Sequence, residues 1–590
     1  MEKAKTRGKA GRTILICAFA AVLILNLVLT IRHEMWCDEA QAWLLARDMG
    51  PLSIFSKLSY EGHPFLWFYI LMPFAKAGVS YSFIKAISFC IITIAVWILL
   101  FYSPFSIPAR IILAFSPAVL YFYASISRSY CLIALFTVLA AMLHGRRQEK
   151  PLLFGLVCAL LLQTHIIMAG MVFFMCLAWL IHVLRRKDGS FRKAFPGLCL
   201  PLLSAVFLLW QMRGVAQADA ARGEAAGGLR HMLGTYVWAL YYNVFDMMHR
   251  QRWLLCIFAI AAVGFFFTAF IAGIRAKQGI FTDVHENEML AAEAYGKEKT
   301  AARKTSDLPD AAINRETLTA AVCEALAVII GGVAFQNIIY AFVYYANVYR
   351  LITWLYMLIY GAWIVTDALI CSQKAAVKST ETDGVSDKAV KPTETDEVSD
   401  AAVKTTEARS VSDPAAKKGG CTRRPLTVWL AEACCIVMFA CAVTGMHLEY
   451  SPQAILDLKG PFTYAQETAD FINSLPPDAV ILENREDICN SVIPRLKDRT
   501  VWSPFGWRTA SYAERSRTYR HSITVDELIK ETREHFPDAE GFYLLYAVVS
   551  DHYMEIEGIE EYLADKEPVL ATPGNVMAGE DYKIYYIAME

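Results

Sequence analysis

The chain has 590 residues, of which 56% are hydrophobic and 19% are charged. An average soluble domain carries about 45–50% apolar and about 25% charged residues, so this composition excludes an ordinary soluble protein. The formal net charge is −1, and most charges lie in a few blocks between long apolar stretches. We therefore predict a mainly α-helical, polytopic membrane protein, with membrane lipid as a partner and no nucleic acid.

The N-terminus is a basic segment followed by a long apolar run. Residues 1–12 carry five basic side chains, and the apolar run 13–31 is long enough to span a membrane. Arg32 to Trp36 follow without a small-residue cleavage site, which favours a retained first helix over a cleaved signal peptide. Because basic residues mark the cytoplasmic side, residues 1–12 are expected in the cytoplasm and the loop 32–63 outside.

Further apolar segments follow, with basic clusters at the expected cytoplasmic turns. The segments run approximately over 64–79, 82–102, 109–126, 129–144, 151–166, 167–184, 196–212, 253–274, 318–346, 348–370 and 426–446. We expect about 11–13 transmembrane helices. One segment between 64 and 144 is expected not to cross fully. The dipeptide Ser116-Pro117 is a candidate break, because irregular backbone is tolerated at membrane depth where it is buried or lines a cavity.

These segments predict five regions. They are a cytoplasmic N-terminus at 1–12, a transmembrane catalytic domain at 13–371 with outer loops 32–63 and 213–252, a cytoplasmic linker at 372–424, a last transmembrane helix at 425–446, and an extracytoplasmic domain at 447–590. The linker contains a degenerate thirteen-residue repeat that begins at Thr380, Thr393 and Thr406. The repeat has almost no bulky apolar residues and cannot bury a core, so the linker is expected to be disordered.

The C-terminal region reads as a small α/β domain. Helix-like stretches at 464–475 and 525–536 are followed by strand-like stretches at 479–482 and 542–549, and 582–588 is a further strand. Alternation of this kind favours an α/β sheet. The chain is thus expected in the cell membrane, with this domain outside.

Acidic residues mark one loop. From residue 13 to residue 148 the chain has five acids, and all lie in the outer loop: Glu34, Asp38, Glu39, Asp48 and Glu61. Because charge beside a bilayer is costly, carboxylates gathered between two membrane-grade segments indicate a working site.

Two interpretations of Asp38 are open. Asp38 can cap the amphipathic segment 40–48, with Gln41 as its reciprocal partner, and that segment is expected to lie along the membrane surface. Alternatively, Asp38 is a catalytic base that accepts the proton of an acceptor hydroxyl, with Glu39 beside it. Capping explains one acid but not Glu39, Glu61 and His63 together.

Other polar residues at the expected outer face can complete a site. Glu61 and His63 return to the membrane just before Pro64. Arg128, next to Tyr130, can bind a phosphate as a fork of donors, or it can be a snorkelling interfacial side chain. His165 separates two short apolar segments and can contact a phosphate or sugar. Arg230 and Arg350 are further candidates for the same cavity.

The motifs in the first loop resemble a known family. Asp38-Glu39 directly after the first helix, the helix ending Ala46-Arg47-Asp48, and the Glu61…His63-Pro64 entry resemble the membrane-spanning glycosyltransferases of the GT-C fold. The similar branches are the protein O-mannosyltransferase-like and lipid A aminoarabinose transferase-like ones, including bacterial members of undefined substrate. The resemblance covers residues 13 to about 213, and the later helices in outline.

The resemblance implies a transferase that moves a sugar from a polyprenyl-phosphate donor to a glycan, lipid or protein acceptor outside the membrane. It assigns the base role to Asp38, with Glu39 adjacent, and lines the cavity with Glu61 and His63. Some family members have an Asp where this chain has Arg128-Ser129-Tyr130. A metal site is therefore not carried over, and the cofactor stays open.

Two other classes remain as alternatives. A transporter or flippase for a lipid-linked sugar would show inverted repeats and charges deep within helices, whereas the acids identified here are expected at the surface. A non-catalytic scaffold that displays the C-terminal domain would leave the acid cluster without a purpose.

Overall fold

The computed structural model describes residues 2–186, 188–214, 251–294, 310–342, 348–386, 426–516, 518–548, 554–574 and 578–589, with a few positions between 230 and 240. The chain divides into two compact units. The first comprises Met1–Ala262, Cys323–Ile364 and Cys435–Glu590, and the second comprises Val263–Val322 and Val365–Cys434. Every residue of the candidate site described below belongs to the first unit.

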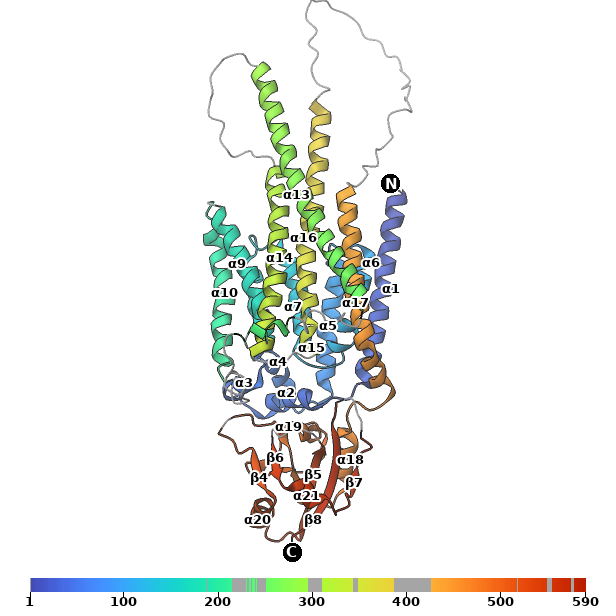
Figure 1. Ribbon diagram of the computed structural model, residues 1–590, viewed down its shortest axis with the longest axis vertical. Coiled ribbons are helices and arrows are strands. Elements are labelled where there is room, and N and C mark those ends of the chain that lie inside the picture. The colour runs from blue at the N-terminus through green and yellow to red at the C-terminus, as the bar shows by residue number, and fades with distance from the viewer. Residues whose placement is uncertain are drawn as a thin grey trace, which may run out of the picture. The chain divides into compact units, whose positions relative to one another are not determined.

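The membrane part is helical, as predicted. Its helices are α1 (Glu2–Arg32), α2 (Cys37–Asp48), α3 (Phe55–Glu61), α4 (Leu66–Lys76), α5 (Phe83–Tyr102), α6 (Ile107–Ala114), α7 (Tyr130–His144), α8 (Pro151–Leu162), α9 (Ala169–Arg185), α10 (Ser190–Gln211), α13 (Arg252–Ala294), α14 (Asp310–Phe342), α15 (Val348–Leu351), α16 (Thr353–Ser386) and α17 (Leu426–Lys459) (Figure 1). By length and composition, eight described helices can cross a membrane, and α4, α7 and α8 are shorter apolar helices. The chain is a polytopic membrane protein, with eight described helices able to cross a membrane against the 11–13 predicted.

Two apolar segments are interrupted where the sequence predicts breaks. Helix α6 ends at Ala114, and the π-helix η1 (Ala118–Phe122) follows Ser116-Pro117. Helix α8 ends at Leu162, and the 3-10 helix η2 (Ile166–Met168) begins after His165. Proline cannot donate a backbone hydrogen bond and disfavours a helical residue before it. The irregular backbone is buried in protein and carries Ser127, Arg128 and His165, which all contribute to the site below.

Helices α16 and α17 are among those that extend beyond the predicted apolar segments. Helix α17 continues through Pro452 to Lys459, whereas a transmembrane end at 446 and a domain start at 447 were expected. Contacts with the bundle hold this extension, because His447 Nε2 lies 3.0 Å from the carbonyl oxygen of Phe115 and Asp457 contacts the end of α1. Helix α16 extends to Ser386. Residues 387–425 of the linker and most of the outer loop 213–252 lie outside the described residues.

The C-terminal region forms the predicted α/β domain. A six-stranded sheet has the order β3-β2-β1-β5-β8-β7, in which β1 is parallel to both β2 and β5, while β8 is antiparallel to β5. Its strands are β1 (Ile481–Glu483), β2 (Trp502–Ser503), β3 (Arg508–Thr509), β5 (Gly541–Val548), β7 (Leu570–Ala571) and β8 (Asp581–Ala588). A second sheet pairs β4 (Ser522–Thr524) with β6 (Glu555–Glu557). The remaining helices are α18 (Ala465–Ser474), α19 (Glu486–Cys489), α20 (Val525–His535) and α21 (Ile559–Leu563), with the 3-10 turn η5 (Ile493–Arg495).

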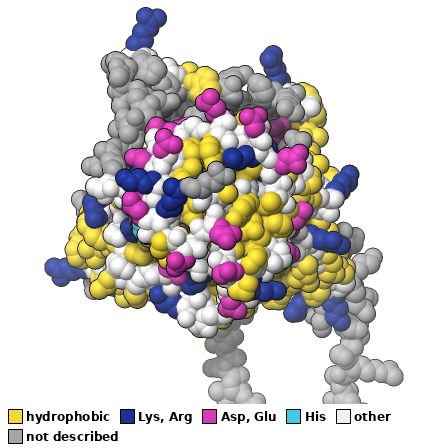
Figure 2. All heavy atoms as spheres, turned by 90° about the horizontal axis from the view of Figure 1, so that it is seen from below, with side chains coloured by type: hydrophobic (Ala, Val, Ile, Leu, Met, Phe, Trp, Pro, Cys, Tyr) yellow, Lys and Arg dark blue, Asp and Glu magenta, His cyan; other side chains and the backbone are white. Residues whose placement is uncertain are grey.

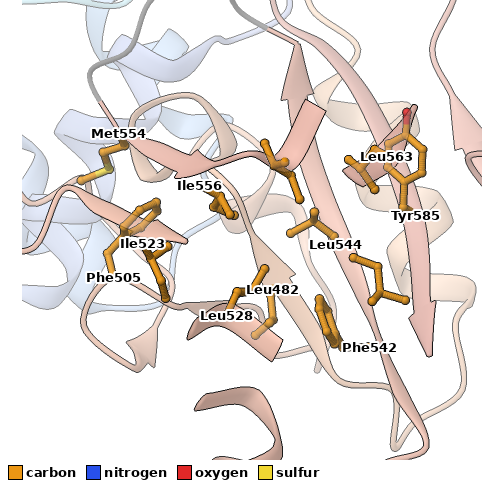
Figure 3. Packing of buried hydrophobic residues seen from close by; sticks show 12 residues of the cluster. Leu482, Phe505, Ile523, Leu528, Phe542, Leu544, Met554, Ile556, Leu563 and Tyr585 are labelled. Carbon is orange, nitrogen blue, oxygen red and sulfur yellow. The ribbon is translucent and has the colours of Figure 1, made fainter. Parts of the chain in front are cut away.

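One apolar cluster holds this domain together. Leu482 of β1 and Leu544 of β5 pack with Leu528 of α20 and Ile556 of β6, and all four are buried (Figure 3). Burial of such side chains contributes about 1.5–3 kcal/mol each, relative to exposure. Seen from below, acidic and basic side chains are mixed with apolar ones, so this face has no field of a single sign (Figure 2). The C-terminal domain thus has its own hydrophobic core.

Candidate functional site

Helix α2, which carries Asp38 and Glu39, is a buried element. Residues from Glu39 to Ala46 are all buried, including Trp43 and Leu44. The helix packs against α4 of the membrane part and α19 of the C-terminal domain (Figure 1). The apolar side chains of this helix are therefore covered by protein, and its expected position along the membrane surface stays a prediction.

The start of α2 distinguishes the roles of its two acids. The cap position is Trp36, and its backbone N–H donates to Glu39 Oε2 at 3.1 Å. The capping interpretation of Asp38 with Gln41 is therefore wrong: Glu39 satisfies the cap, and Gln41 binds elsewhere. Asp38 is left to point across the loop, with 29% of its side chain exposed.

Asp38 pairs with Arg128, and Arg128 with His63. Arg128 NH1 donates to Asp38 Oδ2 at 2.6 Å, and Arg128 NH2 donates to His63 Nε2 at 2.8 Å. The guanidinium also lies 5.4 Å from the ring centre of Tyr130. Three residues singled out in the sequence thus meet, although they come from α2, the α3–α4 turn and the turn before α7. Arg128 is 7% exposed, so it is an integral part of this group rather than a snorkelling side chain.

His63 is neutral in this setting. Burial lowers the pKa of its imidazole well below the usual value, and the positive charges of Arg128, Arg350 and Arg515 lower it further. A guanidinium can only donate, so Nε2 accepts from Arg128 and the ring proton sits on Nδ1, facing Ser129 Oγ at 3.5 Å. Several arginine charges therefore lie near the His63 imidazole, and the electrostatic potential there favours an anionic ligand.

Aromatic rings form the wall behind His63. The rings of His63 and His165 lie edge to face with centres 4.7 Å apart, and His165 stacks on Tyr130 at 5.6 Å. The stack continues through Tyr123 at 5.6 Å and Tyr356 at 5.3 Å. Tyr130 and His165 were identified in the sequence as site residues, whereas Tyr123 and Tyr356 were not. Each lies inside a long apolar segment, where an aromatic residue carries no distinguishing signal.

Glu61 is the last residue of α3 and is joined to α2 by Gln41. Gln41 Nε2 donates to Glu61 Oε1 at 2.7 Å, and the Arg515 side chain lies 4.0 Å from the same oxygen. Burial raises the pKa of Glu61, while Arg515 and the Gln41 amide lower it. The charge of Asp38 also raises that pKa, so the two carboxyl groups share one environment.

The C-terminal domain reaches this loop through residues 510–516, which we name the strap. Gln41 Oε1 accepts from the backbone N–H of Ala513 at 2.7 Å, and Gln41 Nε2 donates to the Ala513 carbonyl at 3.1 Å. Glu514 of the strap pairs with Lys57 of α3. Asn490 Nδ2 adds a bond to Gln41 Oε1 at 3.0 Å. Sequence reasoning missed the strap, because no local pattern signals a partner more than 400 positions away.

The remaining candidates lie apart or carry secondary roles. Glu39 is fully buried, and its Oε1 accepts from the Ser127 backbone N–H at 2.6 Å. Arg350 is close enough for its charge to act on His63 and His165, whereas Arg230 is exposed. Among the described residues, no group of three or more His, Cys, Asp or Glu side chains could hold a metal ion.

A buried acid inside a later apolar segment was overlooked in the sequence. Glu324 lies inside the apolar part of α14 and pairs with Arg147, whose NH2 is 3.1 Å from Glu324 Oε2. The expectation that all acids lie at the surface is therefore wrong. Both side chains are about nine-tenths buried, so each charge is compensated, which is the usual condition for an ion pair in such a place.

The fold and the site together define a polytopic membrane protein. A partly buried Asp–Arg–His group lies beside the ends of several helices and is joined to a folded C-terminal domain. No family model and no curated protein matches the chain. Among solved structures, the crystal structure of ArnT from Cupriavidus metallidurans bound to undecaprenyl phosphate is similar to it. The similarity covers 97% of each chain at 10% identity, with a TM-score of 0.44.

Proposed function

We propose that this protein is a membrane glycosyltransferase that moves a sugar from a polyprenyl-phosphate donor to an extracytoplasmic acceptor, with Asp38 as the catalytic base. The single observation that supports this most is the pairing of Asp38 with Arg128 and of Arg128 with His63. It joins a carboxylate that can take a proton to a cation that can hold a phosphate. The sequence resemblance to GT-C transferases agrees with it.

The donor side of the proposed reaction is cationic. Arg128 offers a planar fork of donors, which matches a phosphate or diphosphate. The charges of Arg350 and Arg515 act on the same place, as the depressed pKa of His63 indicates. A polyprenyl tail can stay in lipid while its phosphate meets these cations. Because no nucleotide leaves, no nucleotide-binding fold is required.

Asp38 is suited to the base role and Glu39 is not. The Asp38 side chain is 29% exposed, and only its Oδ2 is engaged by Arg128 in the described contacts. Glu39 is fully buried and bonded to the backbone of Ser127 and Trp36. We therefore assign Asp38 to proton transfer and Glu39 to holding the loop.

The proposed reaction follows from competition for Arg128. Arg128 binds Asp38. A donor phosphate takes over the guanidinium and leaves the Asp38 carboxylate to accept the proton of the acceptor hydroxyl. The acceptor oxygen then bonds to the anomeric carbon of the sugar as the bond from that carbon to the phosphate oxygen breaks. The phosphate leaves as polyprenyl phosphate, with its charge stabilised by Arg128.

Glu61 and His63 are proposed to line the same cavity rather than to exchange protons. Neutral His63 holds the far side of the Arg128 fork, and Tyr130 with His165 backs it with flat ring surfaces. Glu61 pairs with Arg515 of the strap, and its proposed role is to bind the acceptor. Sugar hydroxyls suit such a mixture of carboxyl, imidazole and ring faces.

The test of this function compares lipid-linked sugars and surface glycans, by mass spectrometry, in cells with the chain, without it, and with Asp38→Asn. We expect the donor lipid to accumulate in the last two and to disappear with the wild-type chain. The matched control is Glu34→Gln, an acid of the same loop whose carboxylate lies 3.4 Å from the Thr463 amide nitrogen. Identical lipids and glycans in all strains would contradict the proposal.

A further inference from the structure

A chain of buried charges runs from Glu39 to the end of the last membrane helix. His33 Nε2 lies 3.1 Å from Glu39 Oε2, and His33 Nδ1 lies 2.9 Å from Asp457 Oδ2. His33 directly follows α1, Glu39 is in the first turn of α2, and Asp457 is near the end of α17. Three elements that are far apart in the sequence therefore meet through one imidazole.

Each carboxylate has a further partner. Glu39 Oε1 accepts from the Ser127 backbone N–H at 2.6 Å, and Asp457 Oδ2 accepts from the Tyr121 hydroxyl at 2.8 Å. His33, Glu39 and Asp457 are all at least 95% buried. A buried carboxylate is stable only when it is paired and hydrogen-bonded; both pair with His33, and of the two Asp457 oxygens only Oδ2 has a hydrogen-bond partner among the described residues.

His33 is the cation of the group. Burial alone lowers the pKa of its imidazole, but Glu39 and Asp457 outweigh burial and raise that pKa to about 9. At neutral pH an imidazolium therefore sits between two carboxylates. Removing one member of a buried ion pair is far more damaging than removing both, because it leaves a charge uncompensated.

The His33–Glu39–Asp457 group is next in sequence or by a hydrogen bond to both Asp38 and Arg128. Glu39 follows Asp38 directly, and Ser127, whose amide Glu39 holds, precedes Arg128. The Glu39 carboxylate therefore fixes the backbone next to Asp38, the proposed base, and next to Arg128, the residue proposed to bind phosphate. A small rotation of either backbone would change the 2.6 Å contact between Asp38 and Arg128.

We propose that His33 and Asp457 are positioning residues, which lock Glu39 between α1 and α17 and so align Asp38 with Arg128. This inference rests on the proposed transferase function, but it concerns two residues that do not touch the Asp38–Arg128–His63 group. It also explains why α17 continues past the expected membrane boundary, since Asp457 lies in that extension.

The test is a charge series measured as kcat and KM for the polyprenyl-phosphate donor. We expect His33→Gln to lower kcat by about 10²-fold, the loss that a displacement of about 1 Å can cause. Asp457→Asn should cost less, because His33 keeps Glu39 as a partner. The double variant His33→Gln/Asp457→Asn should have a kcat at least about tenfold higher than that of His33→Gln. The reason is that it no longer contains a buried Asp457 carboxylate without a counter-charge.

A second measurement does not depend on activity. In ¹⁵N-histidine-labelled full-length protein in lipid bilayers, the wild type should show an imidazolium signal at pH 8 that His33→Gln lacks. Asp457→Asn should lower the pH at which this signal disappears. The matched control is His535→Gln, which removes an exposed histidine of α20 outside the group and should leave the signal and kcat unchanged.

The outcomes separate this inference from the proposed function. If Asp38→Asn abolishes transfer but the charge series stays within about twofold of wild type, the positioning role is refuted and the transferase stands. A double variant no better than His33→Gln would also refute the charge lock. If no donor is turned over by the wild type, the proposed function fails, and the NMR signal alone then decides whether the lock exists. If His33→Gln does not insert into the membrane, the kcat and the imidazolium signal of Asp457→Asn together test the inference.

Discussion

Gln41 and Ala513 are 472 positions apart in the chain and pair through both polar groups of each, as two neighbouring strands would. The Gln41 amide accepts from the Ala513 N–H at 2.7 Å and donates to its carbonyl at 3.1 Å, and the same amide reaches Glu61 and Asn490. One buried side chain thus joins the loop that carries Asp38 to the C-terminal domain. In open α/β sheets, ligands bind outside the carboxyl ends of the strands. Here the segment that follows β1 faces α2 instead, through Asn490.

Gln41→Ala should therefore uncouple the domain from the loop. The change leaves the buried N–H of Ala513 without its acceptor, a loss of about 1–3 kcal/mol. We expect lower thermal stability, faster proteolysis between the membrane part and the domain, and a lower transfer rate. Limited proteolysis with Gln466→Ala, an exposed glutamine of α18, as the control measures this. Equal digestion rates for both variants and the wild type would show that the Gln41–Ala513 pairing does not stabilise the contact between the domain and the loop.

Glu61 should tolerate an amide better than truncation. Burial raises the pKa of its carboxyl group, so the neutral form is accessible, and a glutamine oxygen can still accept from Gln41. Glu61→Gln should retain most of the thermal stability. Glu61→Ala leaves the Gln41 amide with a lost partner and should cost about 1–3 kcal/mol. A denaturation series on both variants checks the order, and a Gln variant as unstable as the Ala variant would contradict it.

The His33 group predicts a pH dependence of stability. The pKa of His33 is raised from 6.5 to about 9, so its stabilising contribution is fully present below about pH 6.5 and is lost as the pH rises through about 9. The contribution is about 3 kcal/mol. The apparent Tm of wild type should fall between these values more steeply than that of His33→Gln. Parallel curves for the two proteins would mean that His33 does not bind its proton in this way.

Arg128→Lys should weaken the site although it keeps the charge. The guanidinium bonds Asp38 and His63 at once, which a single ammonium on a flexible stem cannot reproduce. We expect a loss of roughly tenfold or more in affinity for polyprenyl phosphate, since charge-assisted hydrogen bonds contribute about 1.5–3 kcal/mol each. Native mass spectrometry with added undecaprenyl phosphate measures this. Lys193→Arg, on the exposed start of α10, is the control.

The local features of the fold were predictable from the sequence. The breaks after Ala114 and Leu162 follow from proline and from polar residues between apolar runs. Helix α20 and strand β5 lie within a residue of the predicted bounds, because their hydrophobic patterns are regular. Asp38, His63 and Arg128 were identified because charge in an apolar chain stands out.

Long-range partners were not predictable in this way. Gln41 and Asp457 look ordinary in the sequence, and their importance comes from contacts with Ala513 and His33. The separation of Asp38 from Glu39 also depends on the fold, because adjacent residues in a helix point about 100° apart. The sequence does not show which residues contact Asp38 and which contact Glu39, so it does not distinguish the roles of the two acids.

Asp38→Asn, assayed for binding and transfer in the same preparation, tests the central claim most directly. The account predicts that undecaprenyl phosphate binds the variant at least as tightly as wild type, because Arg128 is released from its carboxylate. Sugar transfer should fall by about 10²- to 10⁴-fold, the usual contribution of a general base. Transfer by Asp38→Asn at the wild-type rate would contradict the account.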